Sequence, residues 1–417
     1  MFNESIRYDG DRLFCDSIPV ADIVAETGTP VYIYSLKRAV ANLRGIQAAF
    51  PKAHIHYSAK ANANLAVLRA LIEAGAGIDA VSGGEIHRAL KAGAKPENIV
   101  FAGVGKTSGE LYYAVEHDIG WFNLENIEEA RLLNSIAGVA GKQVRVAVRF
   151  NPDVNANTHR HIATGHSGAK FGLNANVVTE LLDQRASLPN LRFEGLHIHI
   201  GSQLGDIDAT AKAVQAARNL IKPYPDIKTL NIGGGFPVNY SPGRQVPTPA
   251  KFAAALEPLL EGCDVILEPG RSIIADAGML VTRVLYLKHQ GGQRFAIVDA
   301  GMTELIRPAL YDAYHEIVPI THSQDDFSTM LGYHVVGPVC ESADVLSHAA
   351  QLPPVEPNAL LAVLTAGAYG MVMASNYNAR PRPPEVVVSE DGLTWKIARR
   401  RETWDDLTAL ERDIPAR

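Results

Sequence analysis

Hydrophobic and polar positions along this chain alternate with two different periods. Runs of six to ten residues that are rich in apolar side chains are separated by segments in which apolar residues recur every three or four positions. The first pattern is typical of buried strands and the second of amphipathic helices, which we expect at 64–75, 83–93 and 126–138. The predicted strands are HIHYSAK (54–60), GIDAVS (77–82), IVFAGV (99–104), GWFNLE (120–125), VRVAVRFN (144–151), FEGLHIHIGS (193–202), TLNIGGG (229–235) and DVILEPG (264–270).

The order of these elements predicts an α/β architecture. Strands that alternate with helices form parallel βαβ units, and the early strands begin about 22 residues apart, which fits one strand and one helix per unit. Eight units in sequence predict a closed (β/α)8 barrel of the TIM type over residues 35–275. An open doubly wound sheet is the structural alternative, and the number of consecutive units favours closure.

Beyond residue 275 the pattern becomes that of a β domain. SEDGLTW, within 383–400, is the signal of a hairpin turn. The N-terminal stretch 7–35 reads as strand, turn and strand. We therefore predict a C-terminal β-barrel domain built from residues 276–417 together with residues 1–34. Its further strands are expected at 279–290, 293–301, 332–340 and 359–370.

Composition and charge narrow the class of protein. The 417 residues are 47% hydrophobic and 20% charged, as in a globular enzyme of two or three domains. The net charge of -6 argues against nucleic acid or an anionic membrane as a partner. No apolar run reaches the roughly 18–20 residues that span a bilayer, and MFNESIRYDGDRLF lacks the features of a signal peptide. Three scattered cysteines make a reducing, cytoplasmic location the expectation.

Polar residues follow the predicted strands at the end where barrel enzymes carry their active sites. Because the carboxyl ends of the strands share one rim, we expect these residues to meet there. Taken alone, each has an ordinary structural explanation, such as a surface lysine or a glycine turn. The set comprises Lys60 after the first strand, Asp79 and Ser82 at the second, His199 and Ser202 at the sixth, Gly233, Gly234 and Gly235 at the seventh, and Glu268 to Arg271 at the eighth.

The combination points to pyridoxal phosphate. Three glycines leave backbone N–H groups that can approach a phosphate closely. The amine of Lys60 can condense with an aldehyde to form a Schiff base. The carboxylate of Glu268 can pair with a protonated pyridine nitrogen, which makes the ring an electron sink, and His199 is placed to stack on that ring.

The same residues carry a resemblance to a known family. YSAKAN, GIDAVSGGE, HIHIGSQL, NIGGGFP, EPGRSIIADAG, IRPALYDAYHEIV, GPVCES and GAYGMVMASNYNARPRPPEV resemble the motifs of the diaminopimelate decarboxylases, in content and in order. These belong to the fold-type III pyridoxal-phosphate enzymes, and the resemblance extends from about residue 10 to residue 407. It implies a (β/α)8 barrel followed by a β-barrel domain that completes the active site.

The resemblance also implies a role for each matching residue. Lys60, His199 and Cys340 match catalytic residues, with Cys340 as proton donor and His199 stacked on the cofactor. Cys340 and Glu341 are expected to reach the active site of a partner subunit in a homodimer. The implied cofactor-binding residues are Lys60, Asp79, His199, Ser202, Gly233, Gly234, Gly235, Glu268, Gly270, Arg271 and Tyr369. The implied substrate-binding residues are Arg271, Arg307, Tyr311, Glu341 and Tyr369.

The expected reaction is decarboxylation of meso-2,6-diaminopimelate to L-lysine and CO2, the last step of lysine biosynthesis. The substrate carries an amino-acid group at each end, so one end must be held while the other reacts. Arg271 and Arg307 supply forked donors for a carboxylate, and Glu341 a counter-charge for the distal ammonium. Phe236 and Pro237 resemble other branches of the family, so a decarboxylase of carboxynorspermidine, ornithine or lysine is the alternative.

Two further motifs resemble ligand sites but lack the features that such sites need. His159, His161 and His166, together with His197 and His199, invite comparison with a zinc site, but no carboxylate or cysteine completes a ligand set nearby, so no metal is expected. AGVGKTSGE (102–110) lacks the glycine spacing of a nucleotide-binding P-loop.

Overall fold

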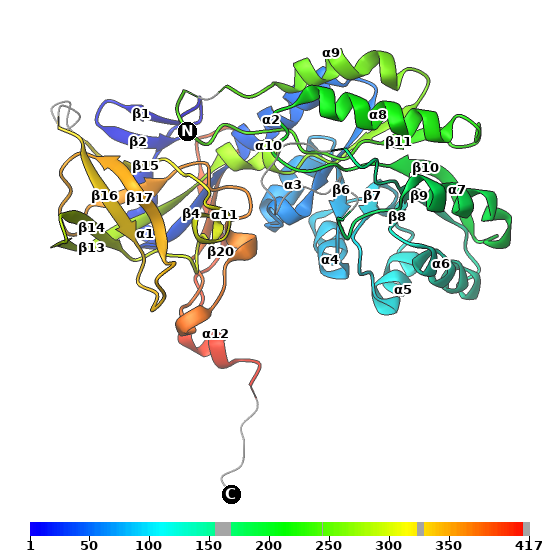
Figure 1. Cartoon of the computed structure of the whole chain (residues 1–417). Helices are drawn as coiled ribbons and strands as arrows, with labels where there is room; N and C mark the ends of the chain where they lie inside the picture. The colour runs from blue at the N-terminus through cyan, green and yellow to red at the C-terminus, as the bar shows by residue number, and fades with distance from the viewer. Residues whose placement is uncertain (155–167, 244, 323–328, 412–417) are drawn as a thin grey trace, which may run out of the picture. The chain divides into compact units, whose positions relative to one another are not determined.

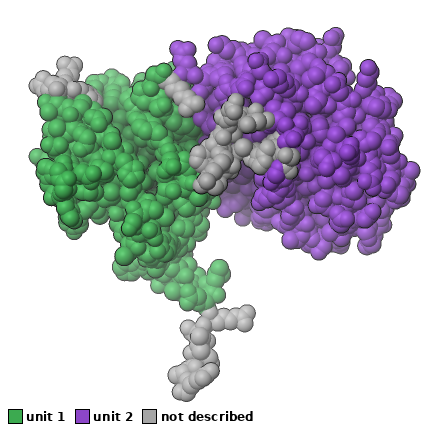
Figure 2. All heavy atoms as spheres, in the orientation of Figure 1, with its two compact units in different colours: residues 1–39, 239–244, 274–417 green, residues 40–238, 245–273 purple. Residues whose placement is uncertain are grey.

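A computed structural model of the chain describes residues 1–154, 168–243, 245–322 and 329–411. The chain divides into two compact units, which Figure 2 shows in separate colours. Unit 1 comprises residues 1–39, 239–244 and 274–417, and unit 2 comprises residues 40–238 and 245–273. The proline-rich segment 241–252 is thus divided between the two units.

Unit 2 is a closed barrel of eight parallel strands, in the order β5 to β12 around the ring. Figure 1 labels strands β6 to β11 of this barrel. The predicted (β/α)8 fold is therefore confirmed. The strands are β5 (Ala53–Ser58), β6 (Gly77–Ala80), β7 (Ile99–Phe101), β8 (Trp121–Leu124), β9 (Val144–Arg149), β10 (Leu191–His197), β11 (Thr229–Asn231) and β12 (Asp264–Leu267). Helix α2 begins and helix α10 ends in unit 1, and the helices between them lie in unit 2. The helices are α2 (Leu36–Ala49), α3 (Leu65–Glu73), α4 (Gly83–Ala92), α5 (Ser108–Glu116), α6 (Ile127–Val139), α7 (Ala175–Asp183), α8 (Ile207–Ile221), α9 (Pro249–Leu260) and α10 (Arg271–Ile274).

Capping side chains begin the helices just after the strands end. Asn64, Ser82 and Asn126 accept hydrogen bonds from the backbone N–H groups of residues 66, 85 and 129, at 2.9, 3.2 and 2.8 Å. Such caps satisfy N–H groups that have no partner within the helix. Each cap therefore helps to set the path of a βα connection, and these connections form the rim that carries the candidate site.

Unit 1 is mostly β, as predicted. Its 13-residue strand β13 pairs with β4, β14 and β18 in a nine-stranded sheet, beside a three-stranded sheet of β1, β2 and β3. The strands are β1 (Ile6–Asp9), β2 (Arg12–Cys15), β3 (Ile18–Pro19), β4 (Val31–Ser35), β13 (Gly278–Gln290), β14 (Gln293–Val298), β15 (Ile317–Pro319), β16 (Leu331–Val336), β17 (Val345–Leu352), β18 (Leu360–Val363), β19 (Glu385–Val388) and β20 (Trp395–Arg399). Helices α1 (Val20–Thr27), α11 (Arg307–Tyr311) and α12 (Trp404–Thr408) complete it.

Helix α1 (Val20–Thr27) was not predicted from the sequence. It interrupts the N-terminal stretch 7–35, for which a strand, a turn and a second strand were expected. Val20, Ile23 and Val24 are buried in a core formed with strands β1, β2, β4 and β13. This spacing of three and four is helical, but the short run is rich in β-branched residues, which also favour strands.

Some predicted strands also extended too far at their carboxyl ends. Lys60 lies in the 3-10 turn Ala59–Ala61, and His199 and Ser202 lie in the loop after β10. Among the described residues, no helix combines the length and the apolar character needed to traverse a lipid bilayer.

Candidate active site

Lys60 sits at the carboxyl end of β5, beside a buried carboxylate. Its Nζ lies 3.4 Å from Oδ2 of Asp79, whose side chain is fully buried, whereas the Lys60 side chain is 42% exposed. Ser58 donates a hydrogen bond of 2.6 Å to the same oxygen. Burial, with the nearby charge of Glu268, raises the pKa of Asp79, while Lys60 and Ser58 oppose that shift. A side chain that is partly exposed is therefore held at its amine by a buried carboxylate, which Ser58 also contacts.

Glu268 follows β12 and lies in a buried polar cluster with Asn123 of β8, Asn231 of β11 and His197 of β10. The two asparagine amides donate to Oε1 of Glu268 at 3.1 and 2.5 Å, and Nε2 of His197 lies 3.3 Å from Oε2. Burial by itself raises the pKa of a carboxyl group, but His197, Lys60 and the Asn231 amide lower the pKa of Glu268 below its ordinary value. The cluster therefore stabilises an ionised carboxylate inside the barrel.

The glycine turn after β11 packs closely against its neighbours. Gly235 has a φ of 96°, and a Cβ there would lie 2.6 Å from the carbonyl oxygen of Gly201. A Cβ on Gly234 would lie 2.3 Å from the carbonyl oxygen of Glu268. Side chains are therefore excluded from this turn, in which the N–H groups of Gly233 and Gly234 donate to Oδ1 of Asn231 at 2.9 Å and to Nδ1 of His199 at 3.3 Å.

His199 lies against the same turn. Its Nδ1 accepts a hydrogen bond of 3.3 Å from the backbone N–H of Gly234. Burial, together with the charge of Lys60, holds the pKa of His199 well below its ordinary value. The ring is therefore neutral at physiological pH and offers a flat face rather than a charge.

Arg271 and Ser202 lie together on the same rim. The guanidinium of Arg271 donates to Oγ of Ser202 from Nε at 3.2 Å and from Nη2 at 3.1 Å. Gly270 packs against the turn of Lys60, because a Cβ there would lie 3.0 Å from the Cβ atoms of Ser58 and Ala61. Unit 2 thus contains Lys60, Asp79, His199, Ser202, Gly233, Gly234, Gly235, Glu268, Gly270 and Arg271.

The five other predicted residues, Arg307, Tyr311, Cys340, Glu341 and Tyr369, belong to unit 1. Arg307 and Tyr311 are the first and last residues of α11. Cys340 and Glu341 are exposed in the loop after β16, whereas Arg307 is buried. Tyr369 has a φ of 56°, in the left-handed region that few non-glycine residues adopt. Such strained conformations are concentrated at ligand sites.

Two side chains anchor the Cys340 loop. Asp344 accepts hydrogen bonds from the backbone N–H groups of Met302 at 2.5 Å and Val339 at 2.7 Å. Asn378 accepts one from the N–H of Cys340 at 2.8 Å. The thiol is therefore presented on a loop that is fixed on both sides.

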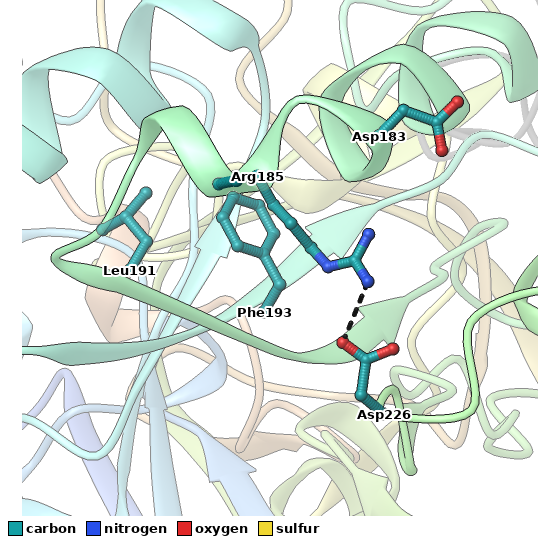
Figure 3. A pocket seen from close by; sticks show the side chains of 6 residues that line it. Asp183, Arg185, Leu191, Phe193 and Asp226 are labelled. Atoms are coloured by element: carbon teal, nitrogen blue, oxygen red, sulfur yellow. Dashed lines mark ion pairs between the residues drawn. The ribbon is translucent and has the colours of Figure 1, made fainter.

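A hollow of 520 Å³ lies at the other end of the barrel (Figure 3). Leu191 and Phe193, at the start of β10, line it, whereas His197 ends that strand. Arg185 and Asp226 form an ion pair of 3.3 Å across it. None of the predicted site residues lines this hollow, and its position opposite the catalytic rim argues against a role in the chemistry.

Several polar residues of these clusters were not predicted from the sequence. Asn123 is the one polar position in the strand Trp121–Leu124, and Asn231 ends the short strand Thr229–Asn231. A polar residue in a buried strand is a usable signal for a buried site. His197 was considered only as a zinc ligand. Among the described residues, no group of three histidine, cysteine or acidic side chains is arranged to hold a metal. His159, His161 and His166 lie outside the described residues.

The chain resembles known proteins in both sequence and fold. Residues 36–275 match the family described as "Pyridoxal-dependent decarboxylase, pyridoxal binding domain". A diaminopimelate decarboxylase of Aquifex aeolicus is 42% identical, over 99% of both chains. The crystal structure of diaminopimelate decarboxylase from M. jannaschii with L-lysine has a TM-score of 0.92 at 34% identity and covers 99% of both chains. That of Helicobacter pylori with L-lysine has a TM-score of 0.88 at 38% identity, covering 94% of this chain and 98% of the other.

Proposed function

Because this chain belongs to the diaminopimelate decarboxylase family of pyridoxal-dependent decarboxylases, we propose that it converts meso-2,6-diaminopimelate to L-lysine and CO2, the last step of lysine biosynthesis. Full-length relatives of about 40% identity carry that name, and two similar structures hold L-lysine. The alternative substrates have less support. A lysine/ornithine decarboxylase of Vibrio vulnificus is 23% identical, which indicates a common fold alone.

The residues of unit 2 fit pyridoxal 5'-phosphate. Three features of unit 2 match the three functional groups of this cofactor. The amine of the partly exposed Lys60 suits the aldehyde, and the ionised, buried Glu268 suits the ring nitrogen. The glycine turn, which has no room for a Cβ, suits the phosphate. When bound, the cofactor supplies an electron-withdrawing ring that accepts the electrons released as CO2 leaves. The ion pair of Lys60 with Asp79, close to the buried Glu268 cluster, is the observation that carries this proposal.

Each residue on the rim of unit 2 has a defined task in the proposal. The amine of Lys60 holds the cofactor, and Asp79 holds that amine. Glu268 keeps a proton on the ring nitrogen, because an ionised carboxylate favours a cation beside it. Neutral His199 packs on the ring face. The phosphate group is assigned to the turn Gly233–Gly235 and to Ser202, with Gly270 keeping the neighbouring loop close to Lys60.

The residues of unit 1 act on the substrate in this proposal. Arg307 and Tyr311 bind the carboxylate that is retained in the product, and Glu341 binds the ammonium beside it. The bond between Cα and the departing carboxylate breaks, and CO2 leaves. The thiol of Cys340 donates the proton that takes its place on Cα. Tyr369, strained at a φ of 56°, contacts cofactor and substrate.

We further propose a homodimer with shared active sites. Cys340 and Glu341 are exposed, and their loop is anchored by Asn378, which follows the exposed Tyr377 in the chain. An exposed reactive loop that is fixed in place, with an exposed aromatic residue beside its anchor in the chain, supports a surface that a second copy covers. The three free cysteines support a reducing, cytoplasmic location.

The proposed activity is tested by measuring CO2 release from separate incubations of the purified holoenzyme with meso-2,6-diaminopimelate, carboxynorspermidine, ornithine and lysine. We expect release from meso-2,6-diaminopimelate at a rate at least about 100-fold above that from the others, because buried polar groups that lack their ligand discriminate strongly against the wrong substrate. Comparable release from ornithine or carboxynorspermidine would point to the alternative. Release from none of them would contradict the assignment.

A further inference from the structure

Arg307 is held by a histidine whose tautomer the geometry determines. Nη1 of Arg307 lies 2.7 Å from Nε2 of His315, and Nδ1 of His315 lies 2.9 Å from the carbonyl oxygen of Leu364. A carbonyl oxygen can only accept a hydrogen bond, so Nδ1 must carry the proton. A guanidinium can only donate, so Nε2 must accept. Both contacts are satisfied at once only by a neutral imidazole protonated on Nδ1.

An aromatic ring holds the same guanidinium from another direction. The Cζ atom of Arg307 lies 4.5 Å from the centre of the Tyr240 ring, and that ring meets His315 edge to face at 5.4 Å. Tyr240 belongs to the short segment 239–244, which is part of unit 1. Arg307 and His315 are 6% and 1% exposed. The position of the guanidinium is thus determined by contacts of different kinds.

We propose that His315 is a positioning residue that fixes Arg307 for a substrate carboxylate, without itself adding a negative charge. A carboxylate at the place of His315 would bind Arg307 more strongly, but it would compete for the charge that the substrate needs. A neutral ring nitrogen orients one N–H group and leaves the positive charge of the guanidinium intact. The inference rests on the proposed function, because L-lysine retains the carboxylate assigned to Arg307.

The inference is tested by the affinity of the holoenzyme for L-lysine, measured by isothermal titration calorimetry. In His315→Gln, the side-chain oxygen reaches the position of Nε2 and can still accept from Arg307, whereas in His315→Asn it reaches only the position of Nδ1. We expect the Gln variant to bind within about threefold of wild type, and the Asn and Leu variants about tenfold more weakly, as for loss of one hydrogen bond to a charged group. KM for meso-2,6-diaminopimelate should rise in parallel, with kcat changed less than KM.

Non-additivity separates this role from a general loss of packing. In an Arg307→Ala background, His315→Leu should weaken L-lysine binding by less than twofold, because the group that His315 positions is gone. His348→Leu, an exposed histidine of the same unit, is the matched control and should bind as wild type. If His315→Leu does not fold, the comparison of Gln with Asn decides the question.

Equal affinity of the Gln and Asn variants, or full additivity with Arg307→Ala, would overturn the role of His315. Wild-type protein that binds L-lysine and releases CO2 from meso-2,6-diaminopimelate would then leave the proposed function intact. Wild-type protein that does neither would contradict the function itself, so the two failures are distinguishable.

Discussion

The side-chain oxygen of Asn378 accepts a hydrogen bond of 2.8 Å from the backbone N–H of Cys340. Asn378 has a φ of 57°, which asparagine tolerates better than most residues. A residue in a strained conformation thus anchors the loop that carries the proposed proton donor.

Replacing Asn378 with alanine should lower kcat about tenfold, because the thiol of Cys340 loses its fixed position, while an asparagine-to-aspartate change keeps the acceptor and most of the activity. Steady-state CO2 release measures this. Asn358→Ala is the matched control, since Asn358 has a φ of 73° but lies in another turn of unit 1. Equal losses in the two alanine variants would mean that backbone strain, rather than the contact with Cys340, is responsible.

Replacing Cys340 with alanine should slow turnover by a factor on the order of 100–10,000, the range for loss of a general acid. The visible absorbance of bound cofactor should persist, because Lys60 and the rim of unit 2 are unchanged. Cys263→Ala, which removes a partly buried cysteine of unit 2, is the control and should turn over normally. A Cys340→Ala protein that has lost its cofactor would show instead that the cysteine is structural.

Replacing Lys60 with alanine should abolish both turnover and the visible absorbance of the lysine-bound cofactor. In the proposal the amine of Lys60 is the group that condenses with the aldehyde, so its removal leaves the cofactor without that bond. An absorbance spectrum after reconstitution and a CO2 assay measure the two effects. Lys91→Ala, on the exposed face of α4, should behave as wild type. Yellow, active Lys60→Ala protein would refute the cofactor assignment.

Replacing Glu268 with glutamine should reduce kcat by roughly 100- to 1,000-fold, the range for loss of a preorganised electrostatic group. The neutral amide fills the same volume but no longer stabilises a proton on the ring nitrogen. Cofactor binding through Lys60 should survive, which separates this variant from Lys60→Ala. Glu261→Gln, an exposed acid just before β12, is the control. Activity close to wild type in Glu268→Gln would show that the carboxylate has no part in the chemistry.

His56 of β5 should make the stability of the protein depend on pH. Burial lowers the pKa of His56 from 6.5 to about 4. Between these two pH values the unfolded chain therefore binds a proton at His56 that the folded chain does not bind. The free energy of unfolding is not reduced by His56 above about pH 6.5. It declines as the pH falls towards 4, by about 3 kcal/mol in total.

Urea unfolding of the protein between pH 7 and pH 4.5 measures this effect. His56→Asn should flatten the decline in the free energy of unfolding, whatever its effect at pH 7. His87→Asn, an exposed histidine of α4, should leave the slope unchanged. An unaltered slope in His56→Asn would mean that other groups govern the acid sensitivity.

Much of the fold followed from the sequence, because repeated local signals agreed. Buried parallel strands read as continuous apolar runs, and the helices between them have a clear amphipathic period. Where a local signal was short, the prediction failed. Helix α1 was read as part of a strand because its few apolar residues include β-branched ones.

The barrel, the mostly β character of the other unit and the residues that follow each barrel strand could all be predicted from local patterns, since a parallel barrel must bring the carboxyl ends of its strands to one rim. The polar groups that support those residues could be identified only in the folded chain. Asn123, Asn231 and Glu268 are separated by up to 145 residues, and Arg307 and Tyr240 come from different segments of unit 1. Such contacts depend on side-chain packing between distant segments, and this packing cannot be predicted from a local pattern along the chain.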